Sequence, residues 1–181
     1  MLDRLTLPVT LHAAEALELR RATGDDLGAI MRLLSDDPVS AGRGDVGSAD
    51  DEPAYAAALE RILGDPGNEL LVAVRAPGTS IGTGEVVGTF QLTLIPGMAR
   101  RGSTRLLVEA VRVSSTERSS GIGSALMRWT TDVAAPALGA SLVQLTSDAA
   151  RVDAHRFYRR LGFVDSHIGF KYAVPSAPSP A

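Results

Sequence analysis

One stretch decides the fold of this chain: Val113-Ser114-Ser115-Thr116-Glu117-Arg118-Ser119-Ser120-Gly121-Ile122-Gly123, where a valine-rich strand enters a turn that starts an amphipathic helix. Backbone N–H groups at a helix start have no intrahelical partner and carry the positive end of the dipole. The spacing Arg118-x-x-Gly121-x-Gly123 therefore predicts a loop that can wrap a diphosphate, since glycine lets a ligand approach the main chain closely. A plain turn fits the same spacing, so both interpretations stay open on these residues alone.

The composition is that of a globular protein with no polyanionic partner. The chain has 181 residues, enough for one domain with a real core, and 45% of them are hydrophobic. It carries 18 Lys and Arg against 21 Asp and Glu, for a net charge of −3. The basic residues are spread along the chain instead of forming a cationic stripe, so we expect no nucleic-acid binding.

Cysteine and histidine usage argues against several kinds of site. There is no Cys, which excludes disulfides, thiolate nucleophiles and Cys-ligated metal. His12, His155 and His167 show no paired ligand spacing, so we expect no metal site. No apolar run reaches membrane-spanning length and no secretory leader is evident. The sequence therefore predicts a cytoplasmic protein with no membrane partner.

The apolar periodicity divides the chain into a core and two ends. We expect residues 1–16 to be an N-terminal extension outside the core, residues 17–174 to form the domain, and the Pro/Ser-rich residues 175–181 to be a flexible tail. A Gly-, Asp- and Ser-rich loop is expected over residues 35–53. The expected strands are 17–21, 70–74, 86–94, 105–113, 141–146 and 164–174, with a hairpin near 78–84, and the expected helices are 23–34, 54–63, 121–135 and 151–161.

Two segments together resemble the GNAT acyltransferase superfamily, whose members transfer an acyl group, usually acetyl, from coenzyme A to an amine. Val113 to Gly123 resembles the superfamily's Q/R-x-x-G-x-G/A diphosphate signature in its place between strand and helix. The second segment, Asp153-Ala154-His155-Arg156-Phe157-Tyr158-Arg159-Arg160-Leu161-Gly162-Phe163, resembles the A-x-x-x-Y-x-x-x-G-F segment near the end of the fold. With Ser166, His167 and Phe170, it looks most similar to aminoalkylphosphonate and other small-molecule amine N-acetyltransferases.

The resemblance implies an α/β (α+β) fold: a mixed central sheet of about six to seven strands flanked by about four helices, with a splayed strand pair for the cofactor. The implied cofactor is acetyl-CoA. A bulged strand would pair with the pantetheine arm, and backbone N–H groups of the turn would hold the diphosphate. The residues implied in cofactor binding are Val111, Arg112, Val113, Arg118, Ser119, Ser120, Gly121, Ile122, Gly123 and Ser124.

The sequence departs from the superfamily at four places. Ser119 replaces a common glycine, and Ser115 stands where a proline is frequent. Arg151 stands where many members have an asparagine that helps hold the cofactor. Leu107 occupies the position of the catalytic glutamate of the histone acetyltransferase branch. The catalytic base must therefore be sought elsewhere.

Two residues are candidates for proton transfer. Glu109 lies two residues after Leu107, and alternate strand residues share a face, so its carboxylate can take a proton from the acceptor ammonium. A salt-bridged or solvated surface glutamate is the alternative. Tyr158, by its position in the superfamily segment, can donate its phenolic proton to the leaving thiolate. The alternative for Tyr158 is a packed core tyrosine.

The acceptor is less well specified. The acidic loop favours a cationic amine, whereas Arg100, Arg101 and Arg105 favour an acceptor with an anionic group such as phosphonate or carboxylate. We therefore expect an acetyl-CoA-dependent N-acetyltransferase acting on a small-molecule amine. Two alternatives remain, a protein or peptide N-acetyltransferase and a non-catalytic CoA-binding regulatory module. The resemblance also makes a homodimer a candidate assembly, because many members dimerise through their late strands.

Overall fold

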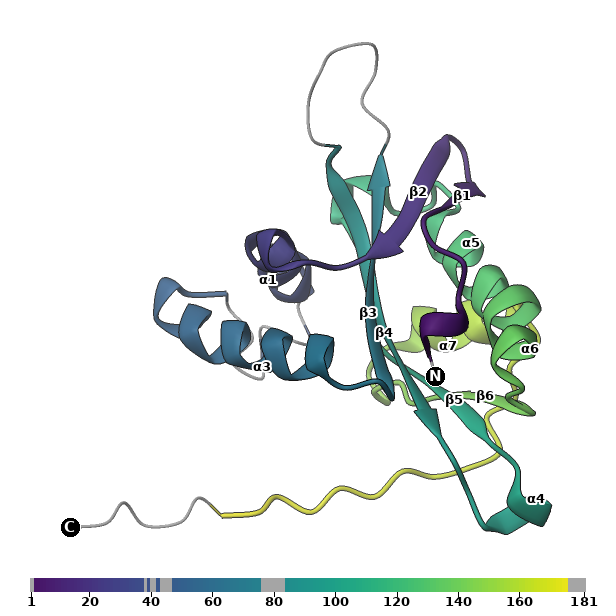
Figure 1. The fold of residues 1–181 in the computed structure, drawn as a ribbon. Coiled ribbons are helices and arrows are strands. Elements are labelled where there is room, and N and C mark those ends of the chain that lie inside the picture. Colours follow the sequence, from purple (N-terminus) through teal and green to yellow (C-terminus); the bar gives the residue numbers. More distant parts are fainter. Residues whose placement is uncertain (1, 38, 40–41, 43–46, 76–83, 176–181) are drawn as a thin grey trace.

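A twisted six-stranded sheet forms the centre of the molecule (Figure 1). The computed structural model describes residues 2–37, 39, 42, 47–75 and 84–175. The strands follow the order β1-β2-β3-β4-β5-β6, and neighbours are antiparallel except for the parallel pair β5–β6. They are β1 (Val9–His12), β2 (Ala16–Arg21), β3 (Asn68–Arg75), β4 (Val86–Ile95), β5 (Arg105–Val113) and β6 (Leu142–Leu145).

Helices cover both faces of this sheet, with α1 and α3 on one side and α5, α6 and α7 on the other (Figure 1). Between α5 and α6 the helix widens into a π turn, where Ala135 N–H bonds to Thr130 O, five residues back. Pro136 follows and has no N–H to continue an ordinary ladder. The helices are α1 (Leu27–Ser35), α3 (Glu52–Gly64), the single turn α4 (Ala99–Gly102), α5 (Ile122–Trp129), the π turn Thr130–Ala134, α6 (Ala135–Leu138) and α7 (Val152–Arg160).

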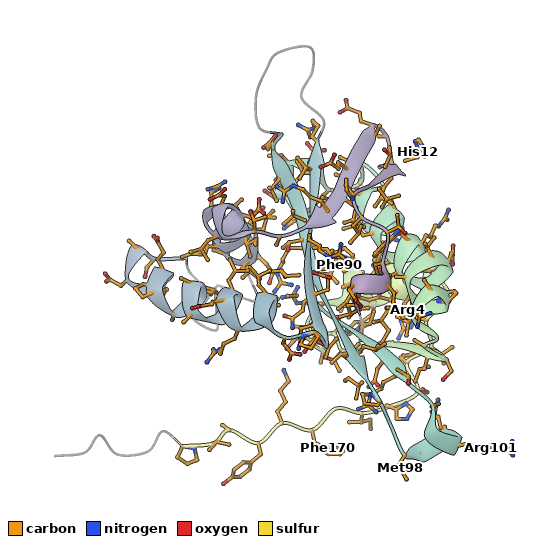
Figure 2. The ribbon with its side chains drawn as sticks, in the orientation of Figure 1. Arg4, His12, Phe90, Met98, Arg101 and Phe170 are labelled. Carbon is orange, nitrogen blue, oxygen red and sulfur yellow. The ribbon has the colours of Figure 1, made fainter. Side chains whose placement is uncertain are left out.

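Each face of the sheet has its own core, because alternate residues of a strand point to opposite sides. On the α5 side, Phe90 lies within the sheet and meets Trp129 edge to face, with ring centroids 6.3 Å apart (Figure 2). On the other side, Leu70 and Val72 pack against Ile30 of α1 and Leu59 of α3. Leu106 and Val108 of β5 belong to the core on the α5 side.

The parallel pair β5–β6 separates along its length. Its register runs from Arg105↔Leu142 to Val108↔Leu145, where β6 ends and β5 continues to Val113. A bulge follows directly: Ala110 has a φ of 51°, and Ala110 and Val111 together face the single residue Phe90 of β4. The splayed, bulged strand pair implied by the superfamily resemblance is therefore present.

The N-terminal segment corrects one expectation. Residues 1–16 were expected outside the core, yet Leu2, Leu5 and Leu11 are buried, and β1 pairs antiparallel with β2. The apolar alternation from Leu5 to Leu11 is a strand signal, and pairing with β2 buries its apolar face.

The C-terminal segment corrects a second expectation from the sequence. The strand expected over residues 164–174 is not formed, and the segment runs extended and exposed away from the sheet (Figure 1). Apolar and polar side chains do alternate along this segment, but a strand also needs a neighbouring strand to supply hydrogen bonds. Residues 38, 40–41 and 43–46 of the loop expected over residues 35–53 lie outside the described residues, as do residues 78–83 of the expected hairpin.

The described residues contain neither a membrane-spanning helix nor a metal-binding group of acidic, His or Cys side chains. In that part of the chain no helix combines the length and apolar character needed to cross a bilayer. Within the same ranges, no three His, Cys, Asp or Glu side chains gather as a metal-binding group.

Candidate active site

The turn between β5 and α5 has the backbone of an anion-binding loop. Ser119 and Gly121 both have left-handed backbone angles, with φ of 70° and 88°. The first intrahelical bond of α5 is Ala125 N–H to Gly121 O, at 3.0 Å, so the N–H groups of Ile122, Gly123 and Ser124 precede it. These donors lie at the positive end of the α5 dipole.

Neighbouring contacts hold this loop in place. Ser114 N–H donates to Val87 O at 2.9 Å, and Ser120 Oγ donates to Glu117 O at 2.6 Å. Gly123 faces α7, where a Cβ would meet the Phe157 ring at 3.4 Å, an ordinary van der Waals distance.

Beside the splayed strands lies a hollow of about 1660 Å³ between β5, β6, α7 and the C-terminal segment. Its lining includes Glu109, Val111, Arg112 and Tyr158. Four of the residues predicted from the sequence therefore meet at one site. The residues from Val113 to Ser124 do not line this hollow; Val113 ends β5, and Arg118 to Ser124 form the loop and first turn of α5.

Tyr158 projects from α7 into an aromatic cluster. Its ring packs edge to face against Phe157 and Phe163, with centroids 5.1 and 5.8 Å away. Burial raises the pKa of the phenol above its ordinary value, and the cationic Arg112 and Arg151 oppose that rise. The side chain therefore keeps its proton across the neutral range, as a proton donor requires.

Glu109 is exposed on β5 and lies opposite Gln91 in the β4–β5 ladder. Leu107, two residues earlier, is opposite Thr93 on the same face. The bulge at Ala110 comes after Glu109, so it does not turn the carboxylate to the other face of the sheet.

The end of α1 is bonded to both sides of the site. Asp36 accepts a hydrogen bond from Ser115 N–H at 2.6 Å, and this donor lowers the pKa of its carboxyl group. Arg118 donates to Asp36 O at 3.1 Å, and Arg151 forms an ion pair with Asp37. These two loop carboxylates are thus engaged with the protein itself, which weakens the idea that the acidic loop attracts a cationic acceptor.

The lining of the hollow is rich in cations. Arg100 and Arg105, two of the three arginines singled out in the sequence, line it, whereas Arg101 does not. Glu109, Asp148 and Asp165 are the acidic lining residues among those described. The cationic lining residues are Arg100, Arg105, Arg112, Arg151, Arg159 and Lys171.

The polar residues that share a face of the sheet with Glu109 were not predicted from the sequence. Asn68, Gln91 and Thr93 are joined by side-chain hydrogen bonds there. Asn68 lies 23 residues before Gln91 and 25 before Thr93, so the signal lies in strand register, which local periodicity does not supply.

Comparison with known proteins identifies the class of the molecule. The chain matches the Acetyltransferase (GNAT) family over residues 29–163 and belongs to it. It is an N-acetyltransferase with a mixed α/β fold built on a six-stranded sheet.

Three known proteins are similar to this chain over most of its length. The chain is 31% identical over 157 residues to an aminoalkylphosphonate N-acetyltransferase of Salmonella typhimurium, covering 87% of this chain and 91% of that protein. A Bacillus halodurans C-125 structure described as a transcriptional regulator superposes with a TM-score of 0.75 at 37% identity, covering 87% and 99% of the two chains. Glucosamine-6-phosphate N-acetyltransferase of Arabidopsis thaliana shares the fold, with a TM-score of 0.67 at 17% identity over 89% and 100% of the chains.

Proposed function

We propose that this protein transfers the acetyl group of acetyl-CoA to the amine of a small molecule that also carries an anionic group. The observation that carries the proposal is the hollow itself, where Tyr158 and Glu109 line one space together with six cationic side chains. Two of the six are in ion pairs, Arg151 with Asp37 and Arg159 with Asp165. An amine with a phosphonate, phosphate or carboxylate group matches that lining, because guanidinium groups bind such anions with paired hydrogen bonds.

The backbone fits the proposed cofactor. The left-handed Ser119 and Gly121 shape a loop whose following N–H groups suit a diphosphate, and Arg118 lies beside them. The splay between β5 and β6 leaves room along Val111 and Arg112 for an extended arm. When bound, acetyl-CoA supplies an activated acetyl group as a thioester.

Two side chains then move protons. Glu109 takes a proton from the acceptor ammonium, because only a neutral amine has the lone pair needed for attack. Tyr158 donates its phenolic proton to the leaving thiolate, and the attacking nitrogen returns its second proton to the phenolate as it becomes an amide. Arg112 and Arg151, which oppose the rise in the pKa of Tyr158, would also stabilise the phenolate while it exists.

The named relative supports a phosphonate-type acceptor. The Salmonella protein is an aminoalkylphosphonate N-acetyltransferase, and the present chain covers most of its length. A CoA-binding regulatory module is the second candidate, favoured by the Bacillus halodurans structure described as a transcriptional regulator. Catalysis and regulation differ in turnover, so one assay separates them.

The test is thiol release from acetyl-CoA with an amine panel: aminoalkylphosphonates, amino-sugar phosphates, amino acids, polyamines and lysine peptides. We expect the anionic amines to have the highest kcat/KM, and added salt to reduce that advantage. A preference for polyamines or for peptides would overturn the proposed acceptor. CoA binding without turnover on any amine would favour the regulatory module.

We also propose that the protein forms a homodimer through its C-terminal segment. Val164, Ile168, Phe170, Tyr172 and Val174 alternate along it and are each at least 80% exposed. Among the described residues, β6 forms ladder pairs only with β5, so its outer edge can accept another strand. The cytoplasmic location and the C-terminal limit of the domain at residue 174 stay predictions from the sequence.

A further inference from the structure

A line of polar side chains crosses the face of the sheet that α1 and α3 cover. Asn68 Nδ2 donates to Asp65 Oδ2 at 2.8 Å. Asn68 Oδ1 then accepts from Gln91 Nε2 at 2.9 Å and from Thr93 Oγ1 at 2.6 Å. The line therefore leads from the turn after α3, across β3, to the middle of β4.

The direction of these hydrogen bonds is set at Asp65. An ionised carboxylate only accepts, and the other oxygen of Asp65 already accepts from Gly67 N–H at 2.8 Å. Asn68 must therefore turn its NH₂ group toward Asp65 and its oxygen toward β4. Gln91 in turn must present its NH₂ group to that oxygen, which leaves its own Oε1 on the other side of the amide. The orientation of the Gln91 amide thus follows from the chemistry of its partners.

Gln91 is also the cross-strand neighbour of Glu109. Side chains directly opposite in an antiparallel ladder have Cβ atoms about 4.5–5.5 Å apart and lie on the same face. Glu109 lines the hollow that contains Tyr158. A carboxylate and an amide oxygen therefore share one face of the sheet on neighbouring strands, with Glu109 in the lining of the hollow and Gln91 outside it, and both are hydrogen-bond acceptors.

We propose that Gln91 binds the amine of the acceptor through Oε1, beside Glu109, and that Asp65 and Asn68 are positioning residues that set its amide. A primary ammonium has three donors, so one N–H can go to each acceptor. After Glu109 has taken a proton, the N–H held by Gln91 still orients the nitrogen lone pair. This inference rests on the proposed function, because it assigns the acceptor nitrogen to the side of Glu109.

Two variants test it in steady-state kinetics with the best amine found. Gln91→Leu keeps the size of the side chain and removes the acceptor. We expect the KM of the amine to rise about tenfold or more, as for loss of one hydrogen bond to a charged group, with the KM of acetyl-CoA unchanged.

The second variant, Asp65→Asn, acts at a distance. The new amide keeps its oxygen on Gly67 N–H and turns its NH₂ group to Asn68. Asn68 must then accept from residue 65 and donate to Gln91, so each hydrogen bond reverses its direction. The Gln91 NH₂ group is thereby turned toward Glu109. We expect a higher amine KM, and an acid limb of the pH–rate profile moved to lower pH, because a donor stabilises the charged carboxylate. Asp25→Asn, at an exposed carboxylate elsewhere, is the matched control and should change neither quantity.

Folded Asp65→Asn protein with the wild-type amine KM and acid limb would overturn the inference, as would a Gln91→Leu variant that raises both KM values equally. Thermal melts establish that each variant is folded. Wild-type protein that turns over no amine would overturn the proposed function and this inference with it. An active wild type with unresponsive variants would overturn the inference alone.

Discussion

Arg151, at the start of α7, forms an ion pair with Asp37, at the end of α1, across 114 residues of sequence. Arg151 stands where many members of the superfamily have an asparagine, so the altered residue has a partner of its own. The adjacent Asp36 bonds to Ser115 and Arg118 on the cofactor loop. Two consecutive residues after α1 thus bond to the loop between β5 and α5 and to the start of α7, the two elements that flank the proposed cofactor site.

This ion pair should contribute measurably to stability. Its side chains are only 21% and 16% exposed, so water screens the charges weakly. In a double-mutant cycle of Asp37→Asn and Arg151→Ala, we expect a coupling free energy of about 1–3 kcal/mol from denaturant unfolding. The control is the pair Arg156–Asp153, which is 66% and 97% exposed and should couple by less than about 0.5 kcal/mol. Equal coupling in both pairs would contradict the prediction.

Tyr158→Phe should separate chemistry from binding. Loss of the proton donor is expected to lower kcat about 10²-fold while the affinity for acetyl-CoA stays the same. Burial raises the pKa of Tyr158 above 10.0, so wild-type kcat should fall only as the pH rises through that higher value. The variant should lack this alkaline limb. Wild-type turnover in the variant would rule out the role in proton transfer.

Arg118→Ala should weaken cofactor binding. Arg118 belongs to the loop that leads into α5, its guanidinium donates to Asp36 O in the structure, and charge-assisted bonds to phosphate are among the stronger hydrogen bonds. Isothermal titration calorimetry with CoA should show a Kd about tenfold higher. Arg128→Ala, at an exposed arginine of α5 itself, should leave the Kd unchanged. An unchanged Kd for Arg118→Ala would remove that residue from the proposed diphosphate site.

Asp26 should be a stability determinant with a defined pH dependence. Its carboxylate is 5% exposed and accepts two hydrogen bonds from Arg20 and one from Thr23 N–H, each 2.8 Å long. The Arg20 hydrogen bond is the main cause of the lowered pKa of this group. Asp26→Asn should cost roughly 3 kcal/mol at pH 7, because a largely buried pair loses one charge.

The sign of the pH effect follows from the lowered pKa. The contribution of Asp26 is fully present above the ordinary carboxyl pKa of 3.8 and is lost as the pH falls through the lower folded-state pKa. The difference in Tm between wild type and variant should therefore narrow below pH 3.8. A difference that stays constant to pH 2 would contradict this account.

The C-terminal segment predicts the oligomeric state. Phe170 and Tyr172 are 93% and 86% exposed, and Phe170 projects from the extended segment in Figure 2. Light scattering after size exclusion should give a dimer for the wild type and a monomer for the double variant Phe170→Asp, Tyr172→Asp. Lys171→Glu, between them on the polar face, should remain a dimer. A monomeric wild type, or a double variant that still dimerises, would refute the proposed interface.

Features that depend on neighbouring residues could be predicted from the sequence. Strand β5 was expected over residues 105–113 and has those bounds, and the helix expected from residue 151 is α7. The left-handed Gly121 occurs where the motif places a glycine before a helix. Each rests on periodicity, capping or backbone freedom, which act over a few residues.

Features that depend on residues far apart in the sequence could not be predicted from it. The amphipathic pattern of Leu5 to Leu11 and that of Val164 to Val174 look alike in the sequence, yet the first pairs with β2 and the second pairs with no described strand. Alternation predicts an amphipathic strand but says nothing about which edge will supply its hydrogen bonds.

The sequence by itself determined the family, the strand–turn–helix of the proposed diphosphate loop, and the residues Tyr158 and Glu109 as candidates. Only the tertiary structure decided that Glu109 is paired with Gln91, that Asp36 and Asp37 bond to the protein, and that six cations share one hollow. The reason is physical: backbone conformation responds to nearby residues, whereas register, burial and charge pairing are set when distant segments pack.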